Sequence, residues 1–303
     1  MVVARTHMSQ THSTRSEPHV INLHLEFLRR TSVGNAIFTV QDVKLGSRIS
    51  NLHITLSQPK NPGDEKLEDK AQGYITMSNI ATEDGLSLDT QYTLTSPPAL
   101  PVHLPTLATH RLDENYTIRA ADPFPEFRRA AQNIEMFLVR PDRKDASRPK
   151  SINDQWVRFS PKRVADGRWT NDALGFLVDM FPQIVEHYIN PESEEAAMSP
   201  QSQQRRKEFI KKSKADGHRP FWYPTLVLNL DVKKLLPEEG VEWLFVRVRA
   251  KGIKNGRFDL DIEVWDEAGQ LVATSTHASL IVDASRNLAG RPKQTSKKSE
   301  SKL

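Results

Sequence analysis

Residues 256–282 read GRFDLDIEVWDEAGQLVATSTHASLIV, and this stretch decides the fold class. Apolar and polar side chains alternate strictly from Phe258 to Val264, which is the two-residue period of a strand with one buried face. Ala268-Gly269 then supplies a hairpin turn into a second run of strand-like residues. The stretch therefore predicts two antiparallel strands at the end of a sheet.

A helical pattern lies upstream of these strands. Apolar residues recur at i, i+3, i+4 and i+7 from Leu174 to Tyr188, with Thr170 or Asn171 placed to cap the helix and Pro182 predicting a kink. A long helix followed by antiparallel strands is typical of an α+β fold in which a sheet wraps on a central helix. Two further strands are predicted between them, at 222–232 and 241–250.

The first half of the chain repeats the theme. The segment LHLEF at 23–27 resembles LNLDV at 228–232, with Glu26 standing where Asp231 stands, and an internal duplication is the economical explanation. Alternating segments predict strands at 20–28, 35–43, 51–58 and 73–80.

Composition divides the chain further. The Pro-rich stretch 95–128 is predicted to be a linker that holds neither a helix nor a central strand, and it separates domains at 1–94 and 129–287. The polar segment 190–219 is predicted to be a mobile insert of the second domain, and 288–303 a flexible tail.

Composition also excludes several function classes. The chain has no cysteine, which excludes disulfides, thiolate zinc sites and a cysteine nucleophile. Its 42 basic and 38 acidic residues give a net charge of +4 that forms no folded basic stripe, so no nucleic-acid partner is predicted. No apolar run approaches the length that crosses a bilayer, so no membrane partner is predicted, and no cofactor or metal site is predicted either.

Residues 222–282, together with INLHLEFLRRTSVGNAIFTVQDVKLG at 21–46, resemble the acyl-CoA thioesterase II family in its fungal thioesterase-like branch. The likeness spans roughly residues 3–80 and 129–287 and rests on the joint spacing of Glu242-Trp243, the NGR turn at 255–257 and the DxxGxLVA hairpin from Asp266. The resemblance implies a double hotdog. It also implies that the first hotdog lacks its opening strand and much of its helix, of which VARTHMSQTH at 3–12 is the end.

The resemblance places three residues in the site. Asp231 matches the family's aspartate, while Lys251 and His277 stand where a threonine or serine and a glutamine are expected. Chemically, Asp231 can act as a base or orient His277, a histidine of near-neutral pKa suits proton transfer, and Lys251 can offset negative charge. Strand parity leaves a second interpretation open, in which Asp231 is a solvated strand residue paired with a lysine.

The chain ends in Ser301-Lys302-Leu303, the tripeptide address of the peroxisome matrix, on a segment whose composition favours flexibility. We therefore expect a peroxisomal location and the import receptor as a partner. The favoured function is an acyl-CoA thioesterase-like hydrolase that cleaves its substrate by direct attack of water. Two alternatives stay open: a non-catalytic acyl-thioester binding or assembly protein, and an enoyl-CoA hydratase or dehydratase. Family likeness also implies a homo-oligomer.

Overall fold

The computed structural model describes residues 1–61, 64–119, 129–143, 148–161, 167–189, 208 and 221–283. Its first half contains α1 (Val2–Thr11), β1 (His19–Phe27), β2 (Ile37–Leu45), β3 (Ser50–Pro59), β4 (Leu67–Ser78) and the 3-10 helix η1 (Ile80–Thr82). From there to the long helical region come α2 (Leu104–His110), β5 (Tyr116–Ile118), η2 (Arg129–Asn133), β6 (Ile134–Val139), η3 (Pro141–Arg143) and β7 (Ile152–Phe159). The helical region comprises η5 (Asn171–Ala173), α3 (Leu174–Val178), η6 (Pro182–Val185) and α4 (Glu186–Ile189). The last strands are β8 (Phe221–Trp222), β9 (Thr225–Val232), β10 (Trp243–Arg249), β11 (Ile253–Lys254), β12 (Arg257–Trp265), β13 (Leu271–Leu280) and β14 (Val282–Asp283). Among the described residues, no helix has the length and apolar character needed to cross a membrane.

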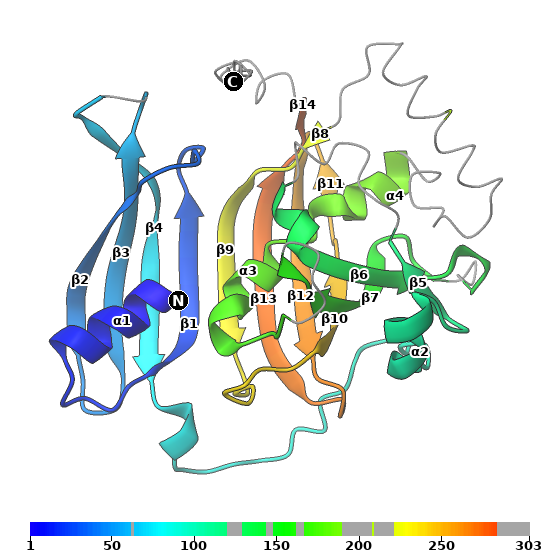
Figure 1. Ribbon diagram of the computed structural model, residues 1–303, viewed down its shortest axis with the longest axis horizontal. Helices are drawn as coiled ribbons and strands as arrows, with labels where there is room; N and C mark the ends of the chain where they lie inside the picture. The colour runs from blue at the N-terminus through cyan, green and yellow to red at the C-terminus, as the bar shows by residue number, and fades with distance from the viewer. Residues whose placement is uncertain are drawn as a thin grey trace, which may run out of the picture.

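One antiparallel sheet runs through both halves of the chain (Figure 1). Its 12 strands follow the order β2-β3-β4-β1-β9-β13-β12-β10-β7-β6-β5, with β11 attached to β12, and β8 pairs with β14 in a separate small sheet. The strands predicted at 256–282 are confirmed as β12, β13 and the first residue of β14, and the hairpin turn closes through the Gly269 amide, which donates to the Asp266 carbonyl. The predicted α+β class is therefore confirmed.

The two halves meet where β1 pairs with β9. In this ladder His24 lies opposite Asn229, and the His24 Nδ1 atom is 2.6 Å from the Asn229 Oδ1 atom. Because the strands are antiparallel, a twofold rotation about this central pair superposes 23–27 on 228–232, the two segments that the sequence relates. The register thus has the symmetry expected of two joined hotdogs.

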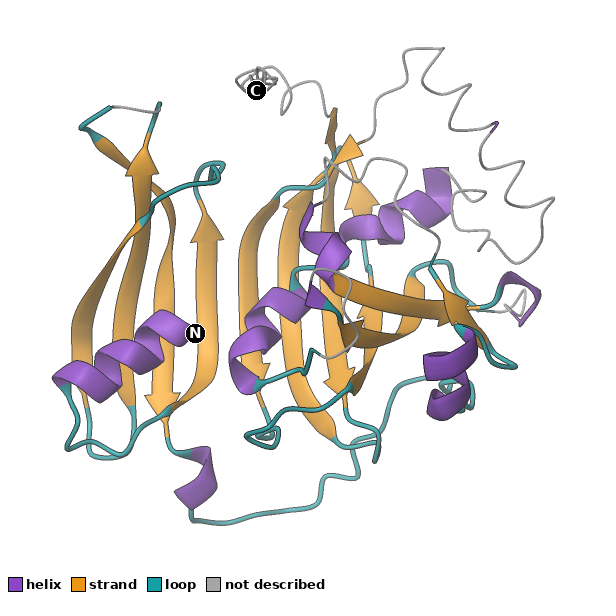
Figure 2. Ribbon diagram, in the orientation of Figure 1, coloured by secondary structure: helices purple, strands orange, loops and turns teal. Residues whose placement is uncertain are grey.

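Helices α1 and α3 cover one face of the sheet, which we call the inner face (Figure 2). Helix α1 lies against the strands of the first half and α3 against β9 and β13. An ion pair of 2.5 Å joins Arg5 of α1 to Asp172 of η5, which directly precedes α3. Met1 also lies close to Gly175 of α3, where an added Cβ would lie 3.3 Å from the Met1 sulfur. The main hydrophobic core lies between these helices and the inner face, and it includes Met8, Leu52, Leu174, Leu177, Leu230 and Val246.

The prediction of a single helix from Leu174 to Tyr188 is wrong. It is broken into α3, η6 and α4, and the break precedes Pro182, whose missing N–H and ring disfavour a continuous helix. The apolar stripe is buried as predicted except at Tyr188, which is exposed. Neither predicted cap residue makes a side-chain cap hydrogen bond; instead, Asn171 exchanges hydrogen bonds of 2.9 and 3.1 Å with the backbone of Leu236.

The predicted linker 95–128 was expected to hold no helix, and this expectation is also wrong. It contains α2 and the short strand β5, and residues 120–128 lie outside the described residues. Pro105 stands in the first turn of α2, where a helix needs no N–H from the residue. Proline content alone therefore does not exclude a helix.

This segment packs on the opposite, outer face of the sheet. Arg247 of β10 makes two hydrogen bonds of 2.7 and 2.6 Å to the Asp154 carboxylate and also donates to the backbone carbonyls of Thr95 and Pro97. The Arg247 and Asp154 side chains are 1% and 0% exposed, so the ion pair is fully covered. A second hydrophobic core surrounds it on this face, formed by Leu107, Tyr116, Phe137, Val139, Trp156, Trp243, Phe245 and Trp265.

Two further predictions cannot be compared with the structure. The insert 190–219 lies outside the described residues apart from residue 208. The tail 288–303, with Ser301, Lys302 and Leu303, lies wholly outside them.

Candidate active site

Asp231, the first predicted site residue, lies on the outer face of the sheet beside the β1–β9 junction. It is half-buried, and its Oδ1 atom accepts a hydrogen bond of 2.7 Å from the Asn22 amide nitrogen. Its cross-strand partner in β13 is Thr274. Asp231 is therefore held by the side-chain amide of Asn22 from the other half of the chain, and among the described residues no lysine forms an ion pair with it.

His277 lies on the inner face instead. Its cross-strand partner is Leu228, which is 1% exposed in the main core, and His277 itself is 6% exposed. Residues directly opposite each other in an antiparallel ladder point to the same face, and successive residues alternate. Leu228 and Asp231 are three residues apart, so His277 and Asp231 lie on opposite faces. The structure does not bring them together, and Asp231 does not orient His277.

The environment of His277 also corrects its predicted pKa. Burial away from water lowers the pKa of His277 from 6.5 to about 4, so the imidazole is neutral at neutral pH. The Ser275 hydroxyl donates to the Asn229 carbonyl at 2.5 Å, which leaves the Ser275 oxygen as an acceptor for the His277 Nε2–H at 3.0 Å. The His277 Nδ1 atom then keeps a lone pair that can accept a hydrogen bond from a water molecule.

Lys251, the third predicted residue, lies near neither Asp231 nor His277. It is exposed at the turn after β10, and its Nζ atom lies 2.9 Å from Asp261 and 3.6 Å from Asp259. The hydrogen bond to Asp261 raises the pKa of Lys251. Among the described residues its ion-pair partners are these two aspartates, so the lysine forms a surface pair apart from Asp231 and His277.

Asp179 was not among the predicted site residues, and among the described carboxyl groups it is the one whose pKa is raised most. It follows the last residue of α3, and its Oδ1 atom accepts a hydrogen bond of 2.8 Å from the Thr225 hydroxyl of β9. Desolvation raises the pKa of Asp179 from 3.8 to about 6, and the Thr225 hydrogen bond opposes this only in part. A carboxyl group with such a pKa is a typical general base near neutral pH.

Asp179 and His277 approach the same region of the inner face. Thr225, the partner of Asp179, lies opposite Ser279, which is two residues from His277 and on the same face of β13. We call Asp179, Thr225, Ser275 and His277 the inner cluster. It consists of two hydrogen-bonded pairs, Asp179 with Thr225 and Ser275 with His277, on one face of the sheet. A carboxylate, a hydroxyl and a neutral imidazole are groups that can position a water molecule and accept its proton.

A signal for Asp179 was present in the sequence. Asp179 follows Leu177 and Val178 and precedes Phe181, all of them buried, so an acidic residue stands at the border of an apolar stripe. Helical periodicity identifies such a stripe as core and says nothing of the polar residue at its border. Which strand residue meets the carboxyl group depends on the packing of α3 on β9, which sequence periodicity does not contain.

Both halves of the chain match models of the same protein family. A family model described as the acyl-CoA thioesterase N-terminal domain matches residues 1–78, and one described as the acyl-CoA thioesterase C-terminal domain matches residues 106–281. The thioesterase-like protein TwmA of Talaromyces wortmannii is 32% identical over 297 residues, which cover 94% of this chain and 82% of that protein.

Solved structures show the same fold. A hot dog fold protein of unknown function from Alicyclobacillus acidocaldarius has a TM-score of 0.59 at 19% identity and covers 93% of this chain and 86% of its own. A putative thioesterase II from Thermobifida fusca has a TM-score of 0.57 at 18% identity, and the match covers 93% of this chain and 84% of that protein. The predicted double hotdog is confirmed.

Proposed function

Because the chain belongs to the acyl-CoA thioesterase family, we propose that it cleaves an acyl-CoA thioester into a free acid and coenzyme A by direct attack of water. The observation that supports this most is Asp179, a desolvated carboxyl group with a pKa of about 6, hydrogen-bonded to Thr225 on the inner face. Membership of the family makes the protein thioesterase-like, whereas acyl-CoA as the substrate is our proposal.

Asp179 acts as the general base in this reaction. Its carboxylate accepts a proton from the attacking water while the water oxygen bonds to the thioester carbonyl carbon. The tetrahedral intermediate then collapses, the carbon–sulfur bond breaks, and the sulfur leaves as a thiolate. The proton held by Asp179 passes to that sulfur, which gives the free thiol and restores the carboxylate. No covalent acyl-enzyme forms.

Thr225 and His277 position the base and the water. The Thr225 hydroxyl donates to Asp179 and so fixes the orientation of its carboxylate. The Nδ1 lone pair of neutral His277 accepts a hydrogen bond from the water, which aligns the water oxygen for attack. His277 has a pKa of about 4, so it takes no proton at neutral pH. The rate is therefore expected to follow Asp179 alone and to rise as the pH passes through about 6.

Thiol release from a panel of acyl-CoAs tests the proposal, with the Asp179→Asn and Asp231→Asn variants side by side. We expect the wild-type protein to release thiol, Asp179→Asn to lose this activity and Asp231→Asn to retain it. If Asp231→Asn alone abolished turnover, Asp231 would be the base, which is one of the two roles that the sequence suggests for it. Binding of acyl-CoA by a folded wild-type protein without turnover would favour the alternative of an acyl-thioester binding protein.

For the cellular location, we propose the peroxisome matrix, with the import receptor as the partner of Ser301-Lys302-Leu303. The support is the sequence of the tail together with a family that acts on thioesters. A fluorescent protein fused to the last dozen or so residues tests the proposal. We expect punctate fluorescence that becomes diffuse when the tripeptide is removed. Diffuse fluorescence of the intact fusion would contradict the proposal.

A further inference from the structure

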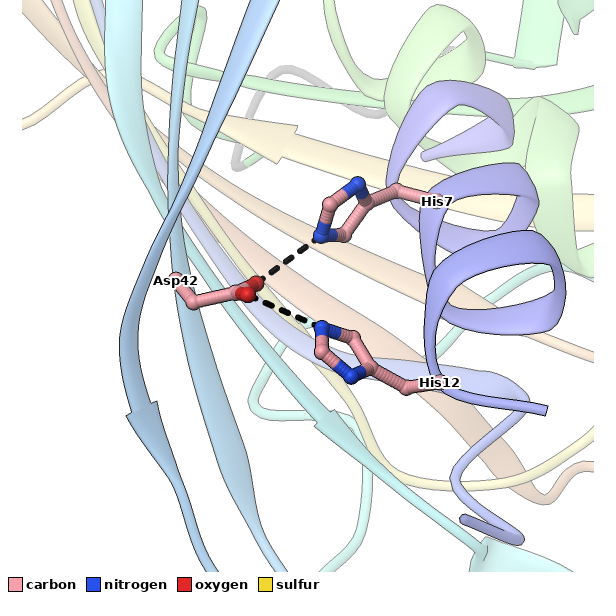
Figure 3. A group of neighbouring side chains, drawn as sticks. All are labelled: His7, His12 and Asp42. Atoms are coloured by element: carbon pink, nitrogen blue, oxygen red, sulfur yellow. Dashed lines mark hydrogen bonds and ion pairs between the residues drawn. The ribbon is translucent and has the colours of Figure 1, made fainter. Parts of the chain in front are cut away.

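A second polar group lies at the far edge of the first half, away from the inner cluster. The side chains of His7 and His12, from α1 and its C-terminal end, point toward the Asp42 carboxylate of β2 (Figure 3). The His7 Nε2 atom lies 2.8 Å from one carboxylate oxygen of Asp42 and the His12 Nε2 atom lies 2.9 Å from the other. The three ligand atoms that the residues offer all lie within 4.8 Å of one another.

The local backbone explains how two histidines five residues apart converge. Positions i and i+5 do not share a face of a continuous helix. His12, however, is the C-cap of α1, and its φ of −127° and ψ of 44° leave the helical region. The chain turns there, and the two imidazole rings approach edge-to-face with centroids 5.4 Å apart.

The orientation of Asp42 is set by an irregularity in the β2–β3 ladder. Asp42 lies opposite Leu52, which is fully buried on the inner face, so the carboxylate faces α1. The register shifts between Asp42 and Lys44, and Lys44 lies opposite Asn51 instead. Asn51 is the residue before Leu52 and points to the outer face, so the Lys44 ammonium group is directed away from the carboxylate.

Charge and burial at this site favour a cation. The Asp42 carboxylate is directed at both imidazoles, with its two oxygens 2.8 and 2.9 Å from the Nε2 atoms of His7 and His12. Among the described residues the ion-pair partners of Asp42 are the two histidines alone. The side chains of His7, His12 and Asp42 are 19%, 16% and 32% exposed, which shelters the ligand atoms and still admits an ion from solvent.

We propose that His7, His12 and Asp42 bind a divalent transition-metal ion of the zinc class. Two imidazole nitrogens and one carboxylate oxygen are a ligand set that suits Zn²⁺, with water in the fourth position. In a tetrahedral site with bonds of about 2.1 Å, neighbouring ligand atoms lie about 3.4 Å apart. In the structure the two imidazole nitrogens approach different oxygens of the carboxylate, and the three ligand atoms lie within 4.8 Å of one another, so rotation of the side chains has to bring them to this spacing when the ion binds.

The bound ion joins α1 to β2, the edge strand of the sheet, which has β3 as its neighbour on one side only. Since α1 and β2 are separated along the chain by β1, the ion acts as a cross-link at this corner of the first half. The proposal is independent of thioester hydrolysis, because none of its three residues belongs to the inner cluster.

Titration calorimetry of the full chain, freed of metal by a chelator, tests the site with Zn²⁺ and with Mg²⁺. We expect one equivalent of Zn²⁺ to bind and to raise the thermal midpoint, and Mg²⁺ to do neither, because imidazole is a poor ligand for that ion. His7→Ala, His12→Ala and Asp42→Asn each weaken Zn²⁺ binding at least tenfold. The matched control His110→Ala, which removes an exposed histidine on α2, leaves it unchanged.

The site can also be identified by its ligands. Co²⁺ bound to two imidazoles and a carboxylate in tetrahedral geometry has visible absorption that a surface-bound, fully hydrated ion lacks, and each of the three variants removes it. Far-ultraviolet circular dichroism shows whether the variants fold. Absence of one-equivalent Zn²⁺ binding to the wild-type protein, or equal binding in folded His7→Ala and His12→Ala variants, overturns the proposal and leaves the group as a hydrogen-bonded contact between α1 and β2.

Discussion

Replacing Asp179 with asparagine is expected to abolish hydrolysis and at the same time to stabilise the protein near neutral pH. Asparagine has the shape of aspartate, and its Oδ1 atom can accept the hydrogen bond of 2.8 Å from Thr225. The substitution therefore removes the charge and keeps the packing. Loss of a general base typically lowers the rate by about 10²- to 10⁴-fold.

The effect on stability follows from the pKa of Asp179, which is about 6 in the folded protein against an ordinary value of 3.8. At about pH 5 the folded protein holds the Asp179 proton and the unfolded chain has lost it, which contributes about 1.4 kcal/mol to the free energy of unfolding. This contribution is lost as the pH rises through the folded pKa and is gone at about pH 7.5. Asparagine has no such titration. The free energy of unfolding of Asp179→Asn relative to wild type should therefore be about 1.4 kcal/mol higher at pH 7.5 than at pH 5.

Urea unfolding at the two pH values, with thiol release measured on the same preparations, provides the assay. Asp231→Asn is the matched control, since it removes an aspartate charge on the outer face and leaves an acceptor for Asn22. Asp231→Asn should retain the wild-type rate of thiol release. Two results would refute the reasoning. One is a difference in the free energy of unfolding between Asp179→Asn and wild type that is the same at both pH values, and the other is full thioesterase activity of Asp179→Asn.

Three further predictions concern stability. His277 is neutral in the folded protein, so the protein loses stability as the pH falls from 6.5 toward the folded pKa of about 4. Between pH 7.5 and pH 5 the free energy of unfolding of wild type, measured by urea titration, should fall by about 2 kcal/mol more than that of His277→Gln. Equal losses would contradict the burial of this imidazole. Arg247→Met removes two hydrogen bonds from the buried Asp154 carboxylate, which keeps Arg148 as an ion-pair partner, and should lower the free energy of unfolding by about 1.5–3 kcal/mol; an unchanged free energy of unfolding would argue against the covered ion pair. Gly73→Ala places a Cβ atom 1.8 Å from the His24 carbonyl oxygen, so it should push β4 away from β1. We expect the thermal midpoint of unfolding to fall by several degrees. An unchanged midpoint would show that the two strands do not approach each other so closely.

The sequence alone was sufficient for the elements whose cause is local. The alternation from Phe258 to Val264 depends on side chains two residues apart, and β12 forms where the pattern predicts it. The likeness between 23–27 and 228–232 predicted a repeat, and the β1–β9 register relates these segments by a twofold. The buried stripe of the helical region was also predicted, because helical periodicity is a local property.

The candidate site was not predictable in the same way. Asp231 and His277 lie on opposite faces because of the register between β9 and β13. That register pairs residues distant in the sequence, so it cannot be read from either strand alone. The raised pKa of Asp179 and the lowered pKa of His277 are both caused by desolvation, which exists only after α3 and the sheet have packed together.

The sequence by itself therefore determined the fold class, the repeat and the strands, because backbone periodicity is written along the chain. Only the tertiary structure decided which polar groups share a face and which of them lose contact with water. Those properties depend on residues distant in the sequence, such as Asp179 and Thr225, or His7 and Asp42, that come into contact when the helices cover the inner face of the sheet.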